Sequence, residues 1–471
     1  MRNLIAIAVA GALLAGCASG PDYKRPALEL PVASTADSRQ DLSRWWQDYN
    51  DPTLNALVDT ALANNQDLRA AGARVDEARA LLDSARVDYL PDVGIGASSS
   101  RTRPSHKTAS YVPGTPDRIT QHQATLNVSY ELDLWGKVRR ANEAAAAQLA
   151  ASREARHAAQ SAIAAQVAQT YFQLRGLDHK VDVANKTLAT RDESVKLQER
   201  RFKAGVISSL DLAQSKSERE AIAAALPALK AAQSQAERAL AVLVGRSPRD
   251  VAAARIARPA SSVALPNPPA VPTGLPANLL EQRPDLREAE ANLQAASAQI
   301  GVARAQYYPS ISLTGAWGSA SEALGDLFSG PALMWNAAAS LAQPLVGLKR
   351  IDAQVGAAEA RSRQAEAAYA KAVQQAFKET LDALNSMSAA RDSANAQQRR
   401  IDALEQSLKL SELRYKAGQS GYLELLDAQR NLYSTTQDQL DAQVSQLTSS
   451  VDVFRALGGG WSSAEPTQAK Q

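Results

Sequence analysis

The sequence has a single cysteine, few aromatic side chains and little net charge among its 471 residues. One cysteine excludes a disulfide framework within the chain. A net charge of +3 gives no electrostatic reason to expect a nucleic-acid partner. Aromatic residues make up only 5% of the chain while alanine is abundant, and this composition favours long, closely packed helices over a bulky globular core.

Sequence signals of catalysis are also lacking. The chain has no G-x-S-x-G motif, no phosphate-binding loop and no paired carboxylates in a catalytic setting. Its four histidines do not have metal-ligand spacing, so we expect no metal site. We therefore expect no enzymatic activity and no cofactor other than a covalent lipid, with any energy for transport supplied by a partner.

The first twenty residues read as a targeting segment. Arg2 precedes an apolar run, Leu4 to Leu14, that is too short to span a membrane as a stable helix. The run leads to L-A-G-C, which resembles a bacterial lipobox. We expect residues 1–16 to be a lipoprotein signal peptide and Cys17 to be acylated. Ala18 in place of aspartate favours delivery to the outer membrane.

An internal repeat organises the rest of the chain. D-L-R at Asp67 recurs at Asp285, and R-F-K-A-G at Arg201 recurs as R-Y-K-A-G at Arg414. The expected segments are a lipidated N-terminal segment that packs on the helices (17–62), a first repeat (63–246), a proline-rich irregular linker (247–276), a second repeat (277–457) and a C-terminal tail (458–471).

Each repeat shows two hydrophobic periods. Leu126, Val128 and Tyr130 alternate with polar neighbours, which predicts a strand with one apolar face. Other segments have sustained heptad-like spacing, typical of packed coiled-coil-like helices. The expected strands are 93–103, 124–134, 311–319 and 335–345. The expected long helices are 136–204 and 349–416, followed by return helices at 208–244 and 420–457.

Strand number constrains the assembly. No stretch after the N-terminal run reaches about 18 apolar residues, so a membrane crossing would require a closed β-barrel. Four strands cannot close a barrel, because the smallest closed ones have about eight. The chain must therefore share a barrel with copies of itself, and strand number alone leaves two, three or four copies open.

Several motifs in the same order resemble the TolC-type outer-membrane efflux protein family, in particular its OprM- and NodT-like lipoprotein subfamily. They are C-A-S-G-P-D-Y-K-R-P from Cys17, R-W-W at Arg44, D-P-T-L-N-A-L-V from Asp51, E-L-D-L-W-G-K-V-R-R from Glu131 and L-L-E-Q-R-P-D-L-R from Leu279. The resemblance covers nearly the whole mature chain. It implies an α+β membrane protein in the outer membrane of a Gram-negative bacterium, with the helices in the periplasm.

The resemblance also implies an assembly and a function. Three chains would form a homotrimer with a shared twelve-stranded antiparallel β-barrel, four strands from each, on a long helical barrel. The trimer would contact outer-membrane lipid, a periplasmic adaptor protein and an inner-membrane transporter of the resistance-nodulation-division class. It would be the exit duct through which a tripartite pump exports small molecules such as drugs.

A channel of this kind needs a periplasmic gate, and the second repeat carries candidates. Gly205 and Gly418 lie in the expected hairpin turns, where glycine permits the left-handed geometry that ends a helix. The resemblance implies that these tips contact the adaptor. Three residues on one helix face match the constriction of OprM-like channels, with a weaker candidate beside the turn: Leu423, Asp427 and Arg430, and then Glu424.

The charged pair has two interpretations. In a trimer, Asp427 would form a carboxylate ring and Arg430 would tether an acid of a neighbouring chain. The alternative is an ordinary surface pair three residues apart. The first-repeat equivalents, Leu210, Gln214 and Ser217, carry no charge, so we expect only the second hairpin to close electrostatically.

Two other functions remain open from the residues. A periplasmic coiled-coil structural lipoprotein would share the anchor and the long helices, but it would not explain four alternating strands. An exit duct of an ATP-driven protein secretion system would keep the fold and change the cargo.

Overall fold

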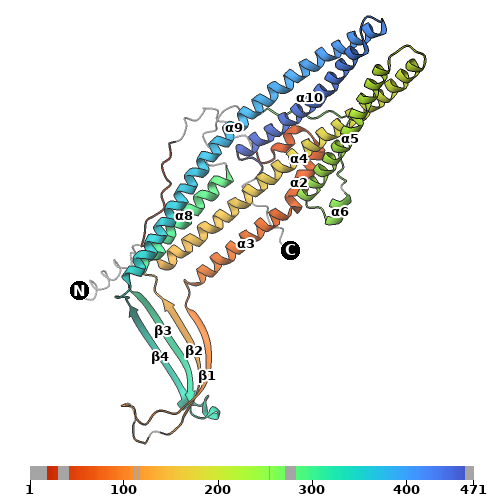
Figure 1. Cartoon of the computed structure of the whole chain (residues 1–471). Coiled ribbons are helices and arrows are strands. Elements are labelled where there is room, and N and C mark those ends of the chain that lie inside the picture. Colours follow the sequence, from red (N-terminus) through yellow and green to blue (C-terminus); the bar gives the residue numbers. More distant parts are fainter. Residues whose placement is uncertain are drawn as a thin grey trace. The chain divides into compact units, whose positions relative to one another are not determined.

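The computed structural model describes residues 19–29, 42–109, 112–114, 116–253, 255–261, 263–270 and 283–461. The signal peptide at 1–16 and the lipidation site at Cys17 lie outside these residues. The chain divides into two compact units, each built from three segments, which are treated separately (Figure 1). The strand unit comprises Met1–Ala27, Val75–Ser152 and Ala289–Tyr369. The hairpin unit comprises Leu28–Arg74, Arg153–Glu288 and Ala370–Gln471.

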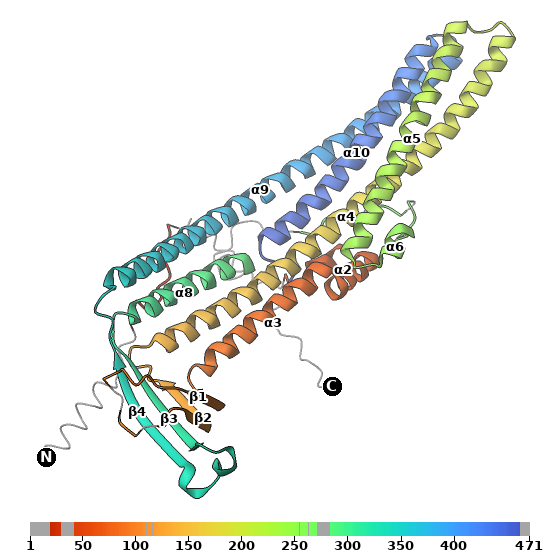
Figure 2. The same ribbon diagram turned by 60° about the horizontal axis from the view of Figure 1, so that its bottom comes forward.

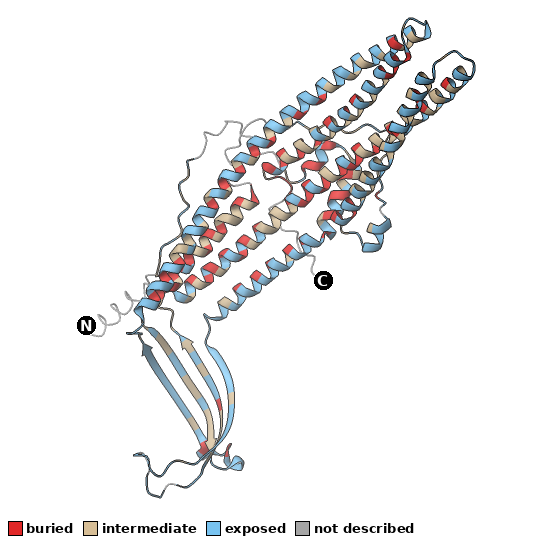
Figure 3. Cartoon of the chain, in the orientation of Figure 1, coloured by how far each residue is buried: buried red, intermediate tan, exposed pale blue. Residues whose placement is uncertain are grey.

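The strand unit contains one antiparallel sheet. Its strands follow chain order: β1 (Asp92–Thr102), β2 (Ile119–Glu131), β3 (Ser310–Ser321) and β4 (Leu333–Ala342). Their side chains are mostly exposed in the single chain (Figure 3). The sheet is open, with β1 and β4 as its two edge strands.

The register gives the sheet two chemically different faces. On one face, Ile95 of β1 lies across from Leu126 of β2, which lies across from Trp317 of β3 and then Trp335 of β4. Ile95 is 87% exposed and Trp335 is 73% exposed, so the described residues leave this apolar face largely uncovered. The opposite face carries small and polar residues: Gly94, Gly96, Ser98, Gln123, Thr125, Asn127, Ser312, Thr314, Asn336 and Ser340.

All four strands differ in their bounds from those expected, and β2 and β4 differ most. β2 begins at Ile119, five residues before the expected start, because the residues from Ile119 to Gln123 pair with the polar end of β1. That end is Ser98–Thr102. The ladder of hydrogen bonds continues there, but the sequence has no alternation of apolar and polar residues that would predict a strand. β4 ends at Ala342, short of 345, and proline two residues later has no N–H to extend a ladder.

Helices make up most of the remaining structure. They are η1 (Trp45–Tyr49), α2 (Pro52–Asn64), α3 (Gln66–Val87), α4 (Lys137–Lys203), α5 (Ser209–Leu243), α6 (Pro248–Ala253), α8 (Pro284–Ala305), η2 (Leu324–Asp326), η3 (Gly330–Ala332), α9 (Leu348–Lys416) and α10 (Tyr422–Ala456). Across the described residues, no helix combines the length and the apolar character needed to cross a membrane.

The sequence predicts an irregular linker between the repeats, but part of this linker is helical. It contains the short helix α6, which starts at a favourable sequence. The Ser247 hydroxyl accepts a hydrogen bond from the Asp250 amide at 3.2 Å, and Pro248 occupies the first helical position. Capping serine and N1 proline both favour helix initiation, so this local signal prevailed over the proline-rich composition.

An aromatic cluster forms the centre of the hairpin unit. Trp45 and Trp46 are 1% and 2% exposed. The Trp45 ring stacks on Phe454 of α10 at 5.4 Å between ring centroids, and Tyr49 lies 5.0 Å from Phe172 of α4. The N-terminal segment is thus anchored by the packing of its two tryptophans.

Helix α10 packs antiparallel along α4 (Figure 2). Gln169 donates to Asp452 at 2.9 Å, and further along α4 Lys180 pairs with Asp441 at 2.5 Å. Between these contacts, a Cβ added at Gly176 would overlap the Val444 side chain. Glycine therefore permits the close approach of the two helices at this level.

Candidate gate at the hairpin ends

Both helical hairpins end in the same backbone motif. Gly205 has a φ of 74°, and the Val206 amide donates to the Arg201 carbonyl at 2.9 Å. Gly418 has a φ of 70°, and the Gln419 amide donates to the Arg414 carbonyl at 2.9 Å. These are Schellman motifs, in which glycine adopts the left-handed conformation that closes the helix. The repeated K-A-G sequence thus specifies the same turn twice.

The helices that leave the two turns start differently. Ser208 and Asp211 form a reciprocal capping box at the start of α5. Helix α10 starts after Gly421, which has no side chain to cap it. The first return helix therefore has a local support that the second lacks.

The expected gate residues lie together on α10. Leu423 is 54% exposed, and the Asp427 side chain is 66% exposed. Arg430 Nη1 lies 3.7 Å from Asp427 Oδ1, so the i, i+3 pair is present within the single chain. The side chains of Leu423 and Asp427 are thus exposed in a single copy of the chain. Arg430, by contrast, has a partner besides Asp427.

The principal partner of Arg430 is Glu218 of α5. Arg430 Nη2 lies 2.5 Å from Glu218 Oε1, and the Glu218 side chain is only 12% exposed. The hydrogen bond to Glu218 raises the pKa of Arg430. The comparison of equivalent positions in the two repeats did not indicate this acid, because Glu218 lies one residue after the neutral Ser217. The ion pair joins the two hairpins of the same chain.

A second arginine approaches Glu218 from α4. Arg191 is 6% exposed, and its guanidinium donates to the side-chain oxygen of Gln429, the neighbour of Arg430. Burial lowers the pKa of Arg191, nearby Glu218 opposes that shift, and the positive charge of Arg430 adds to it. The carboxylate of Glu218 therefore offsets part of the repulsion between these two guanidinium groups.

Tyr415 ties the end of α9 to α4. Its hydroxyl accepts hydrogen bonds from Arg201 Nη1 at 2.7 Å and from Gln198 Nε2 at 3.3 Å. The Arg201 guanidinium also lies over the tyrosine ring, 5.4 Å from its centroid. Arg201 and Tyr415 both belong to the repeated R-[FY]-K-A-G motif, but the sequence did not indicate that the two copies meet.

Glu424 acts within its own hairpin. Its Oε1 lies 3.4 Å from Arg414 Nε at the end of α9. Both side chains are about half exposed, so the pair braces the turn weakly. Among the described residues, no group of three or more histidine, cysteine or acidic side chains could hold a metal ion.

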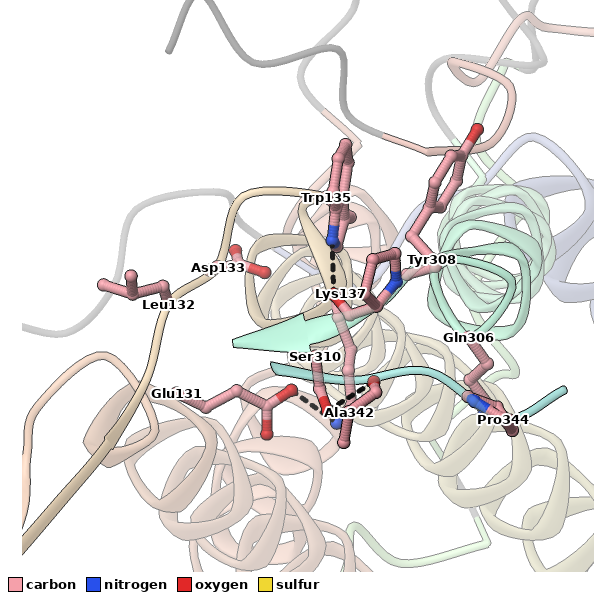
Figure 4. A pocket seen from close by; sticks show the side chains of 12 residues that line it. Glu131, Leu132, Asp133, Trp135, Lys137, Gln306, Tyr308, Ser310, Ala342 and Pro344 are labelled. Carbon is pink, nitrogen blue, oxygen red and sulfur yellow. Dashed lines mark hydrogen bonds and ion pairs between the residues drawn. The ribbon is translucent and has the colours of Figure 1, made fainter. Parts of the chain in front are cut away.

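The strand unit has a separate pocket where the strands meet the helices (Figure 4). Its volume is about 180 Å³. The Trp135 and Tyr308 rings stack at 4.7 Å, and the Trp135 indole N–H donates to the Pro309 carbonyl at 2.7 Å. On the other side of the pocket Lys137 pairs with Glu131 at 3.1 Å. These contacts connect the end of β2 to the start of β3.

A two-faced open sheet joined to long paired helices, with a charged contact where the hairpins end, is the architecture of an outer-membrane channel subunit. The family model described as outer membrane efflux protein matches residues 57–246 and 275–459. The chain belongs to this family. It is therefore an efflux channel protein of the Gram-negative outer membrane, and the fold class inferred from its motifs is confirmed.

Individual relatives agree with this assignment. The chain is 36% identical to the probable efflux pump outer membrane protein TtgC of Pseudomonas putida, over 98% of this chain and 96% of that one. It is 33% identical to the cation efflux system protein CusC of Escherichia coli, over 95% and 96%. The solved outer membrane channel CmeC of Campylobacter jejuni superposes with a TM-score of 0.89 at 26% identity, covering 96% of this chain and 97% of that one.

Proposed function

We propose that three copies of this chain form the exit duct of a tripartite efflux pump. The open sheet carries this proposal. Its edge strands, β1 and β4, leave ladder groups that must be paired in lipid. Three copies give twelve strands, enough for a lumen lined by the polar face, with the apolar face toward lipid. The acyl chains on Cys17 add an anchor.

The hairpin ends form the periplasmic gate of this duct. Three copies would bring together three Leu423 side chains, which narrow the bore, and three Asp427 carboxylates, which favour cations. Arg430 holds α10 against α5 through Glu218. Opening separates these groups, and the second hairpin moves away from the first.

The tips at Gly205 and Gly418 contact a periplasmic adaptor, which connects the duct to an inner-membrane transporter of the resistance-nodulation-division class. Relatives named for efflux pumps and for cation efflux support a small-molecule cargo for this chain. The duct itself performs no catalysis, and the transporter supplies the energy.

Planar-bilayer conductance of the purified protein, together with its oligomeric mass, tests the proposal. A trimer with small, cation-preferring openings is expected. A monomer without conductance would overturn the shared duct and return attention to a structural lipoprotein.

A further inference from the structure

Three arginines gather at the end of β1 and β2 that is farthest from the helices. Arg101 lies within β1, across from Thr120. The ladder ends at the pair of Thr102 and Ile119, so Arg103 and Arg118 are the first residues beyond it on the two strands. All three arginines are exposed. Like charges opposite each other destabilise a sheet end unless an anion lies between them.

The register places Arg101 on the apolar side of the sheet. Alternate residues of a strand share a face, so Arg101 follows Val93 and Ile95 on the side that carries Trp317 and Trp335. Cations on the polar side would face the lumen. Arg101 instead extends the face proposed to contact lipid.

Strand geometry puts Arg101 at the level of the outer headgroups. It is nine residues after Asp92, about 31 Å along the strand, or about 24 Å of height at a tilt of about 40°. The apolar band of such sheets is about 25 Å tall. The stacked pair of Trp135 and Tyr308 marks the helix end of the strands. Trp317 reaches only about 18 Å by the same arithmetic, just below the arginine level.

Local charge is unbalanced at this level. Between residues 101 and 118 the sequence has four cations, which are the three arginines and Lys107, and one carboxylate, Asp117. Asp117 lies 3.4 Å from Arg103 and 3.0 Å from His106. All of these side chains are substantially exposed, so Asp117 offsets little of the positive charge.

We propose that Arg101, Arg103 and Arg118 bind the phosphate groups of lipopolysaccharide in the outer leaflet. Guanidinium groups bind phosphate through paired hydrogen bonds, and the three arginines place several such donors at the same end of the sheet. The inference rests on the proposed orientation, with the helices in the periplasm. The connection between β3 and β4, residues 322–332, carries Glu322 and Asp326 and no cation. The rival hypothesis is therefore that these acids, and not lipid phosphates, pair with the arginines.

Lipopolysaccharide binding to the purified full-length protein tests the inference. The probe is rough-type lipopolysaccharide, titrated into detergent-solubilised protein. The triple variant Arg101→Gln, Arg103→Gln, Arg118→Gln should bind at least about tenfold more weakly, since each lost charge-assisted contact weakens binding. Dephosphorylated lipopolysaccharide should bind both proteins equally weakly. The matched control, Glu322→Gln with Asp326→Asn, should bind like the unchanged protein.

Equal affinity of the triple variant and the unchanged protein for the phosphorylated probe would overturn the proposal. Loss of binding in the acidic control as well would favour contact between the connections instead. Oligomeric mass and bilayer conductance, measured on the same samples, separate these outcomes from failure of the proposed duct. Conductance of the triple variant should match that of the unchanged protein, because Arg101 lies on the face opposite the polar one and the other two arginines lie beyond the ladder.

Discussion

The two hairpins of this chain share one sequence pattern and are stabilised in different ways. Each turn is closed by a glycine in a Schellman motif. Beyond the turn, α5 has the capping box of Ser208 and Asp211, whereas α10 begins at Gly421 without a side-chain cap. The second hairpin depends instead on contacts with the first, through Arg430 to Glu218 and through Tyr415 to Arg201.

This difference indicates how a duplicated unit can acquire a moving part. A local cap stabilises a helix end wherever the helix lies, but a contact between hairpins stabilises one arrangement only. Losing the contacts of Arg430 would loosen the start of α10 from α5, while the contacts of α10 with α4 further along the helix and the cap of α5 stay in place. The first hairpin is thus suited to act as the fixed side of the gate and the second as the moving side.

The largest expected effect comes from removing both charges on α10. Asp427→Ala with Arg430→Ala should raise single-channel conductance several-fold, because the carboxylate ring and the tether to Glu218 disappear together. The repeat provides a matched control, Gln214→Ala with Ser217→Ala, at the equivalent positions of α5. The control should conduct like the unchanged protein, and equal effects of the two double variants would contradict the assignment of the moving side.

A double-mutant cycle isolates the contact between hairpins. Arg430→Gln and Glu218→Gln should each increase the open-to-closed ratio, and their combination should add little to either one. The expected coupling is about 1 kcal/mol, or about fivefold in that ratio, given the partial exposure of Arg430. Fully additive effects would show that the two side chains act independently.

The turn glycines should be equally sensitive. Gly205→Ala and Gly418→Ala each place a Cβ in a left-handed conformation, and no atom beyond the two adjoining residues lies within 4 Å of it. Strain alone should therefore destabilise each turn by about 1 kcal/mol, measured as faster amide exchange in the last helical turn. A much larger loss at one glycine would show that the two turns are not equivalent.

A cap can be added to the second hairpin. Gly421 has extended φ and ψ angles, open space for a side chain, and Glu424 three residues later. Gly421→Ser should form the capping box that α5 already has and stabilise the start of α10 by a few tenths of a kcal/mol. Amide exchange in the first turn of α10 measures this gain, with Ser208→Gly as the reverse change in α5.

Alkaline pH should have no effect on the closed state. The pKa of Arg430 is raised, so its contribution is complete below the unfolded-state pKa and is lost only as pH rises through the folded value. That window lies above the range of bilayer recordings. Conductance should stay constant from neutral to moderately alkaline pH, and an increase there would implicate another titrating group.

Local patterns predicted the main elements of this chain well. Alternation in Leu126, Val128 and Tyr130 indicated β2, and heptad spacing indicated the long helices, because both signals come from neighbouring residues. The start of β2 escaped prediction because its first residues pair with polar partners and show no alternation. The helix α6 was missed because composition outweighed a short capping sequence.

The sequence indicated only those residues of the candidate gate that lie on α10. Family resemblance indicated Leu423, Asp427 and Arg430, but Glu218 and Arg191 depend on how α5 and α4 pack against α10. Ser217 is the first-repeat equivalent of Arg430, and the acid that pairs with Arg430 is its neighbour, Glu218, which has no equivalent among the predicted gate residues. Partners across two hairpins are set by tertiary packing, which a single sequence does not specify.

The most direct test of the two-sided gate is conductance with the hairpins reversibly joined. Cys17 is the single native cysteine and is expected to be acylated, so Glu218→Cys with Arg430→Cys would supply a unique thiol pair. A disulfide-containing cross-linker should hold the variant channel at low conductance, and reductant should raise it several-fold. The same conductance before and after reduction would contradict the central claim that separation of these two helices opens the channel.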